Sequence, residues 1–326
     1  MGYACINMQL SYPQKYGGKE KGVKPITTGR SMIKRTFLTK GVDYASELTL
    51  ANAMDLDKIM DWNILNGYNF FRITSGLAPW KSEYEWNDLK DIERIRMYLH
   101  SAGVKAKTHN LRITSHPGPF NVLTSPHPHV VDNCVSDLTD HGEVFDMMGL
   151  SRTPHNKINI HIGGAYGDKE SAMERFCVNF ERLPDSVKSR LTVENDDKPN
   201  LYSTEMLYEG VHKRVGIPIV FDSHHFEIGP QDQDYHDAYH LARSTWPTGI
   251  RQQCHHSNSR KRYEDPKANK MAHSTWFYTP FETFGNHTDV VLECKAKELA
   301  VMKYRKDFQS GEKIKPTKQL ASQAVA

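Results

Sequence analysis

Residues 217–225 read IPIVFDSHH, a short apolar run that ends in one carboxylate and two histidines. A run of this length, rich in β-branched residues, is typical of a buried strand. Residues 157–164, KINIHIGG, have the same pattern, with His161 shortly before Gly163 and Gly164. Both stretches predict a strand that presents polar side chains at its C-terminal end.

Along the whole chain, eight such runs alternate with amphipathic helical patterns. Gly103, Gly149 and Gly216 each follow a helical pattern, at the place where a C-cap glycine is expected. This alternation predicts an α/β fold, a single-domain (β/α)8 TIM barrel over 1–308, with a disordered tail at 309–326. A doubly wound sheet is the alternative, but no Gly-rich phosphate fingerprint follows the first run. The predicted strands are 3–10, 69–74, 105–114, 157–162, 191–194, 218–222, 249–255 and 290–293, and the predicted helices are 55–66, 87–102, 129–148, 170–183, 204–215, 235–244 and 295–306.

The composition of the 326 residues narrows the class of protein. Neither a secretory signal nor an apolar run long enough to span a membrane is visible, and five scattered cysteines form no CxxC pair. We therefore expect an intracellular protein with no membrane partner. The net charge is only +3, but residues 1–40 hold eight Lys or Arg and one Glu, and 251–270 are also basic. Such segments either face nucleic-acid phosphates or form an ordinary solvated surface.

Metal-binding side chains recur where the predicted strands end. In a (β/α)8 barrel these ends meet at one face, and crowded carboxylates there repel one another unless cations neutralise them. A mixed set of histidines and carboxylates suits Mn²⁺, Zn²⁺ or Fe²⁺ better than Mg²⁺. Any one of these residues could instead make a hydrogen bond or cap a helix. Together these side chains suffice for two or three ions that share a bridging carboxylate, an arrangement used to hydrolyse phosphodiesters. The residues are His116, His161, Glu194, Asp222, His255 and Glu293.

Six motifs in a fixed order resemble the UV damage endonuclease family over residues 1–308. They are HPG (116–118), HIGGAYGDK (161–169), VENDD (193–197), VFDSHH (220–225), HHS (255–257) and LECKAKE (292–298). The resemblance implies a metal-dependent (β/α)8 DNA repair enzyme that nicks duplex DNA immediately 5′ to cyclobutane pyrimidine dimers and 6-4 photoproducts. It also implies two to three divalent ions, expected to be Mn²⁺.

The resemblance assigns roles residue by residue. His116, His161 and Glu194 would hold one ion, and Glu194 would bridge to a second. Asp222, His255 and Glu293 would complete the second site, and His225 and His273 would hold a third ion. Glu194, His255 and Glu293 are the expected catalytic residues, while His224 is expected to be structural. The expected contacts to DNA or the lesion are Tyr3, Asn7, Pro119, Phe120, Gln253, Arg260 and Lys261.

Three positions depart from the family pattern. Pro119 and Phe120 stand where the family has Gln and an aromatic residue that probe the duplex at the lesion. Phe120 is predicted to act as a wedge between bases; the alternative is that it packs under its own loop. Gln253 replaces a lysine two residues before the strand-7 histidine. The motif that starts at His273 lacks its carboxylate, which weakens the third ion site.

Two other functions remain as alternatives. A metal-dependent sugar isomerase or epimerase with the same barrel would use a similar set of ligands. A non-catalytic lesion-binding protein would keep the DNA contacts without the reaction.

Overall fold

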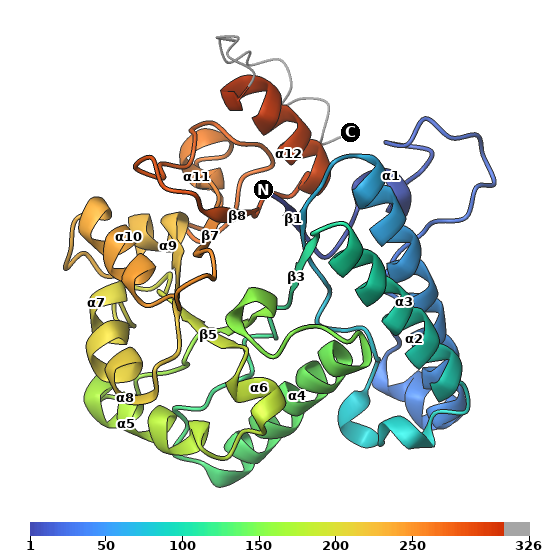
Figure 1. The fold of residues 1–326 in the computed structure, drawn as a ribbon, viewed down its shortest axis with the longest axis horizontal. Coiled ribbons are helices and arrows are strands. Elements are labelled where there is room, and N and C mark those ends of the chain that lie inside the picture. The colour runs from blue at the N-terminus through green and yellow to red at the C-terminus, as the bar shows by residue number, and fades with distance from the viewer. Residues whose placement is uncertain (310–326) are drawn as a thin grey trace.

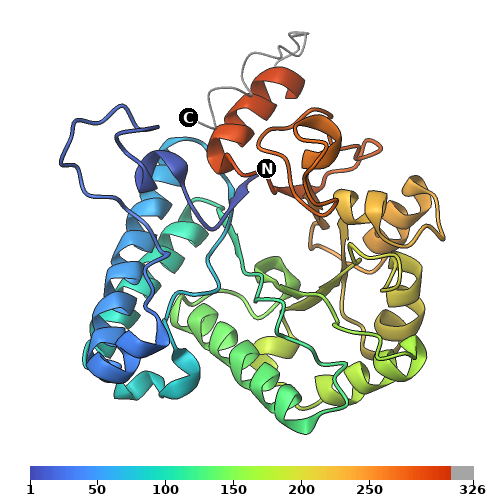
Figure 2. The same cartoon turned by 180° about the vertical axis from the view of Figure 1, so that it is seen from behind.

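The computed structural model describes residues 1–309 as a ring of helices around short parallel strands (Figure 1). The view from behind shows the same ring, with the last helix, α12, beside the first strand (Figure 2). The strands are β1 (Tyr3–Ala4), β2 (Phe70–Arg72), β3 (Arg112–Thr114), β4 (Ile158–Ile160), β5 (Leu191–Glu194), β6 (Ile219–Asp222), β7 (Gln253–His256) and β8 (Asp289–Leu292). The α-helices are α1 (Met8–Ser11), α2 (Lys34–Leu65), α3 (Ile92–Thr108), α4 (Pro128–Met147), α5 (Lys169–Phe180), α6 (Asp185–Lys188), α7 (Thr204–Leu207), α8 (Lys213–Val215), α9 (Ser223–Ile228), α10 (Tyr235–Ser244), α11 (Arg260–Tyr263) and α12 (Lys297–Tyr304).

The strands form one closed parallel barrel. β1 to β3 pair in sequence order, as do β4 to β8. A parallel bridge between Ser115 and Ile158 joins β3 to β4, and one between Gly2 and Val291 joins β8 to β1. Backbone hydrogen bonds support both bridges, for example from Ser115 N to the Lys157 carbonyl at 3.0 Å. The predicted (β/α)8 fold is therefore confirmed.

Alternate residues of the strands face the two sides of the barrel wall. Ile158, Ile160 and Val193 belong to the apolar core between the strands and the surrounding helices. The residues between them are polar, and neighbouring ones contact each other along the inner wall: Thr192 on β5 donates to the side chain of its β4 partner Asn159 at 2.7 Å. The polar interior leads directly to the strand ends that carry the predicted metal ligands.

The predicted strand at 105–114 is wrong over its first half. α3 continues to Thr108, and only Arg112–Thr114 is strand. The prediction that Gly103 caps a helix is also wrong, because Gly103 lies inside α3, where a Cβ would come within 1.8 Å of the Met148 carbonyl oxygen. Helix packing, which a one-dimensional pattern does not show, selects this glycine. Gly149 and Gly216 do follow helices in the left-handed conformation, as predicted.

Other predicted boundaries also change: β7 begins at Gln253 and not at 249, and the predicted helix 204–215 is divided into α7, a π-helical turn and α8. The predicted helix 55–66 is the last third of α2, which begins at Lys34 and is interrupted at Gly41. Its earlier part buries Ala45, Thr49 and Asn52, which are too small or too polar to form an apolar stripe. The predicted strand 3–10 ends at Ala4, because the Asn7 side chain caps α1 by accepting a hydrogen bond from Leu10 N at 3.0 Å.

Within residues 1–309, we find no helix of the length and apolar character that spanning a membrane requires. Gln309 ends the π-helical turn that follows α12, and the rest of the predicted tail lies outside the described residues.

Candidate metal centre

The strand ends surround a cavity of about 760 Å³, called here the central cavity. β3 and β4 lead into His116 and His161, β5 and β6 end at Glu194 and Asp222, and β7 contains His255. Glu293 follows β8 directly. The wall of the cavity includes many groups able to bind a cation or a phosphate: Arg72, His116, His161, Glu194, Asp196, Asp197, Lys198, His225, His273 and Glu293.

Glu194 lies at the middle of this set and is 1% exposed. Its Oε2 is 3.2 Å from His116 Nε2, and its Oε1 is 3.0 Å from His255 Nδ1. Two groups of potential ligand atoms, each within 4.8 Å of one another, share this carboxylate: Glu194 with His116 and His161, and Glu194 with Asp222 and His225. The arrangement places Glu194 where one carboxylate can contact two cations.

Asp222 both ends β6 and caps α9. Its Oδ1 accepts hydrogen bonds from the backbone N–H groups of His224 and His225, at 2.7 and 2.8 Å. Its Oδ2 is buried and has no hydrogen-bond partner among the described residues. An unpaired buried carboxylate oxygen is costly, and a bound cation would remove that cost. This orphaned oxygen and the His/carboxylate donor set fit a divalent metal ion.

The charges of the centre depend strongly on one another. Burial opposes ionisation of Glu194, but His255 and the hydrogen bonds from His116 and His225 outweigh it and hold the pKa well below its usual range. Burial lowers the pKa of His116 to about 4, so this ring is neutral and able to bind a cation at pH 7. Burial also opposes protonation of His225, yet Asp222 and Glu194 raise its pKa well above 6.5. Burial also opposes protonation of His161, but Asp196, whose Oδ1 is 3.1 Å from the His161 Nδ1, raises its pKa.

We expect the affinity for Mn²⁺ to increase with pH. The pKa values of His161 and His225 are raised, so in the ion-free protein these rings keep protons to higher pH than a free imidazole does, and a cation must displace those protons to reach the nitrogens. Below the raised pKa values protons compete with the ion, and above them the competition ends. Calorimetric titration in buffers of different ionisation enthalpy will measure proton release, and pH-independent binding with no release would contradict the expectation.

Comparison with known proteins identifies the family of the chain. The family model for UV-endonuclease UvdE matches residues 1–323. The chain belongs to this family. It is 32% identical to the UV-damage endonuclease of Schizosaccharomyces pombe over 313 residues, which are 92% of this chain but 49% of that protein, so the chain spans about half of that relative's length. It is 30% identical to the UV DNA damage endonuclease of Bacillus cereus strain Q1, covering 87% of this chain and 88% of that protein.

Solved structures show the same fold. The crystal structure of SacUVDE is similar with a TM-score of 0.76 and 28% identity, over 94% of this chain and 96% of that chain. An L-ribulose 3-epimerase is similar with a TM-score of 0.51 and 12% identity, over 81% of this chain and 83% of that chain. At so low an identity the second likeness shows only that the barrel is shared.

The two residues that depart from the family after the HPG motif lie at the edge of the site. Pro119 lines the central cavity. Phe120 is 87% exposed, which excludes the alternative that it packs under its own loop in this structure. Phe120 directly follows Pro119 in the chain, so its exposed ring lies next to a residue of the cavity wall.

Gln253 is buried one layer below His255 on β7, and neither polar atom of its side chain has a hydrogen-bond partner among the described residues. A buried lysine reaches this histidine from another strand. Lys157, just before β4, places its Nζ 3.1 Å from His255 Nε2, on the side of the ring opposite Glu194. This chain thus has a lysine beside the strand-7 histidine, although not at the family's position.

His273 lines the central cavity but belongs to neither of the two ligand groups around Glu194. The family's carboxylate in the same motif corresponds to Thr275, which points elsewhere. Thr275 donates from its backbone N–H and its hydroxyl to Glu264, at 2.6 and 3.0 Å. The third predicted ion position therefore has fewer ligands than the first two.

Of the seven residues predicted to contact DNA, only Pro119 lines the central cavity, and the remaining four not yet described lie elsewhere. Tyr3 and Asn7 are fully buried, with Asn7 donating to the Tyr3 hydroxyl and that hydroxyl donating to Asn63. Neither side chain reaches the surface in this structure. Both instead stabilise the N-terminal segment through hydrogen bonds inside the fold. Arg260 and Lys261 lie on the short helix α11, and Lys261 is exposed.

Three residues of the centre were missed in the sequence. Asn159 donates to Glu194 Oε2, Lys157 contacts His255, and the Arg72 guanidinium forms an ion pair with Glu293. A signal for the first two was present, because Lys157, Asn159 and His161 alternate through β4 and the residues that flank it, and alternate residues of an extended segment share one face. Nothing in the sequence alone pairs Arg72 with a carboxylate 221 positions away.

Proposed function

We propose that this chain is a metal-dependent DNA endonuclease that nicks duplex DNA immediately 5′ to cyclobutane pyrimidine dimers and 6-4 photoproducts. The cofactors would be two to three divalent ions, with Mn²⁺ expected, held by His116, His161, Glu194, Asp222, His225, His255, His273 and Glu293. Acting on chromosomal DNA, the enzyme would work inside the cell.

The shared position of Glu194 supports this proposal most directly. One buried carboxylate belongs to two adjacent groups of potential ligands, and both groups adjoin a wide cavity. Two cations a few ångströms apart can clamp both the attacking and the leaving oxygen of a phosphodiester. The family membership and the exposed Phe120 ring fit the same reaction.

The side chains of this protein have distinct tasks in such a reaction. Bound divalent ions would supply Lewis-acid stabilisation of the charge that develops on the phosphoryl oxygens. Asn159 orients Glu194 by donating to its Oε2, and Arg72 holds Glu293. Because the Arg72 guanidinium also lines the central cavity, it can attract a phosphate there. Phe120 would hold the opened duplex at the lesion by stacking.

An incision assay tests the proposal. Protein stripped with EDTA and reloaded with Mn²⁺ would be given UV-irradiated and unirradiated supercoiled plasmid, and nicking of the irradiated plasmid alone is expected. An end-labelled duplex with one pyrimidine dimer then maps the cut. Binding without nicking would instead indicate the lesion-binding protein, and epimerisation of a ketose without nicking would indicate the sugar enzyme.

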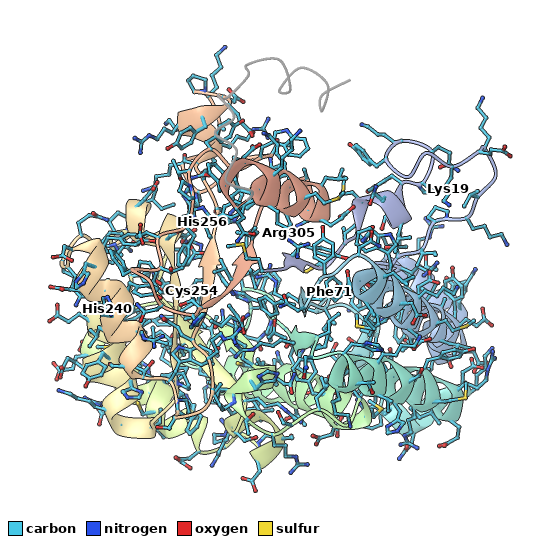
Figure 3. The ribbon with its side chains drawn as sticks, turned by 45° about the horizontal axis from the view of Figure 1, so that its top comes forward. Lys19, Phe71, His240, Cys254, His256 and Arg305 are labelled. Carbon is cyan, nitrogen blue, oxygen red and sulfur yellow. The ribbon has the colours of Figure 1, made fainter. Side chains whose placement is uncertain are left out.

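The basic segments should contribute affinity rather than lesion choice. Lys19 lies in an exposed N-terminal loop that projects from the barrel (Figure 3). The basic residues tested are Lys15, Lys19, Lys21, Lys24, Arg260 and Lys261. Replacing all of them by Gln should weaken binding of damaged and undamaged duplexes alike. It should also reduce the slope of the salt dependence of binding by about 0.9 for each phosphate that is no longer neutralised. Lys213→Gln, whose ammonium contacts Glu209 on the same helical segment, is the control. Weaker binding confined to damaged DNA would refute this assignment of the basic residues to phosphate contacts.

A further inference from the structure

Tyr166 is an exposed aromatic residue of the central cavity to which the proposed reaction gives no role. It lies in the loop between β4 and α5 and is 49% exposed. Within residues 1–309 it is the only Phe, Tyr or Trp that lines this cavity. Apolar ring surface in contact with water is unfavourable, and exposed tyrosines of this kind are typical of contact surfaces. The ring is therefore available to a ligand that enters the cavity.

The surrounding loop fixes the position of the ring. The backbone φ of Tyr166 is +50°, a left-handed value that few residues other than glycine adopt. A Cβ on Gly164 would lie 3.2 Å from the ring, so the ring packs closely against this part of the backbone. The guanidinium carbon of Arg175 is 5.7 Å from the ring centroid, and Arg175 Nε donates to the Thr124 carbonyl at 2.8 Å. Backbone strain of this kind persists where the surrounding structure enforces it, and it is common at ligand-binding sites.

The Tyr166 loop packs directly against the Phe120 loop. A Cβ on Gly163 would lie 2.4 Å from Val122 Cγ1, so only glycine permits this approach. Val122 follows Phe120 by two residues, and each loop begins at a histidine that is predicted to hold the first ion. The two exposed rings therefore belong to neighbouring loops that are in contact beside the metal centre.

A cationic side chain lines the same cavity from the loop after β5. Lys198 is exposed and belongs to the cavity wall. Its loop is joined to the Tyr166 loop, because the Tyr202 hydroxyl donates to the Gly164 carbonyl at 3.3 Å and Lys169 Nζ donates to the Leu201 carbonyl at 2.6 Å. An exposed ring and a lysine in one wall are the groups that bind an unstacked nucleotide, through its base and its phosphate.

A free phosphate fits this part of the wall less well. Asp196 and Asp197 line the cavity as well, and their carboxylates repel an anion. The ring must therefore contribute most of the affinity, which favours a ligand with a flat aromatic face, such as a nucleobase.

A pyrimidine dimer requires more than one ring. The dimer spans two stacked bases, whereas one aromatic side chain is a single layer thick, so Phe120 alone cannot cover both bases that flank an opened dimer. We propose that Tyr166 stacks on the base immediately 5′ to the dimer in the strand that is cut, while Phe120 fills the gap at the dimer itself. Lys198 contacts the phosphate of the nucleotide that Tyr166 binds. This inference rests on the proposed function and specifies one further contact of the same site.

Removal of the ring tests the contact. Tyr166→Asn should add little backbone strain, because Asn adopts left-handed conformations more readily than most residues. Binding of a dimer-containing duplex by EDTA-stripped protein should weaken at least about tenfold, and KM for incision should rise by a similar factor while kcat stays within about twofold. Tyr166→Phe, which restores the ring, should recover the parental affinity. Tyr44→Asn, at a partly exposed tyrosine of α2 outside the cavity wall, is the matched control.

A fluorescent base locates the contact. 2-Aminopurine directly 5′ to the dimer loses a stacking neighbour when the dimer opens, and a ring that covers it quenches its emission. In complex with EDTA-stripped protein, emission from this base should be low with the parent and higher with Tyr166→Asn. The same probe directly 3′ to the dimer should give equal emission with both proteins.

Three results would overturn the proposal. The first is parental affinity and parental KM in Tyr166→Asn. The second is a change of emission at the 3′ probe alone, which would place the ring on the other side of the dimer. The third is a lower melting temperature of Tyr166→Asn with unchanged emission at the 5′ probe, which would make the ring a structural part of its loop. Failure of the proposed nuclease would appear separately, as a parent protein that quenches the 5′ probe and does not nick in Mn²⁺.

Discussion

Glu194→Gln should reduce nicking of UV-irradiated plasmid by at least about a hundredfold, and should weaken Mn²⁺ binding at the same time. The substitution keeps the volume of the side chain but removes the charge shared by both ligand groups. It also places an amide among His116, His225 and His255, which surround the carboxylate. Two cations would then lose the same ligand, so the effect should exceed that of any substitution confined to one group.

The measurement needs folding and ion content beside the rate. Circular dichroism should show the parental fold, and metal analysis should show reduced occupancy. Glu227→Gln, an exposed carboxylate on the same short helix as His225, should nick at the parental rate. Parental nicking by Glu194→Gln would remove the argument for ions that share this carboxylate.

Phe120→Ala should reduce incision at a pyrimidine dimer by about ten- to a hundredfold, without loss of stability. A dimer pairs and stacks poorly, so the duplex opens there at lower cost than elsewhere, and an aromatic ring can fill the gap. Base–aromatic stacking contributes roughly 1–3 kcal/mol, which corresponds to this range of affinity. Because the ring is 87% exposed, its removal leaves no cavity and the melting temperature should not change.

Other substitutions separate stacking from loop structure. Phe120→Trp should retain incision, and Leu65→Ala, which removes an 84% exposed side chain at the end of α2, should have no effect. Pro119 has no side-chain donor, so the pair should discriminate by shape, and an abasic site should also be cut. Full activity in Phe120→Ala, or strict restriction to pyrimidine dimers, would show that another group recognises the lesion.

Much of the barrel could be read from the sequence. Strands such as β5 and β6 are short apolar runs bounded by polar residues, and this pattern is local, so their positions needed no tertiary information. Boundaries failed where packing overrides local preference. Gly103 resembles a helix end but lies inside α3, since only a residue without a Cβ can approach the Met148 carbonyl so closely. The first part of α2 buries small and polar residues that make no visible stripe.

The set of strand-end histidines and carboxylates was likewise readable from the sequence, because parallel strands bring their C-terminal ends to one face whatever the lengths of the connections. Their mutual arrangement was decided by the tertiary structure alone. Only the closed barrel places Lys157 against His255, pairs Arg72 with Glu293 and leaves Phe120 in solvent. Only the packed fold leaves His224 buried with neither nitrogen paired within residues 1–309, while His256 beside it has partners for both nitrogens. The physical reason is that backbone periodicity sets which residues end a strand, whereas hydrogen-bond partners and exposure depend on contacts between segments far apart in the chain.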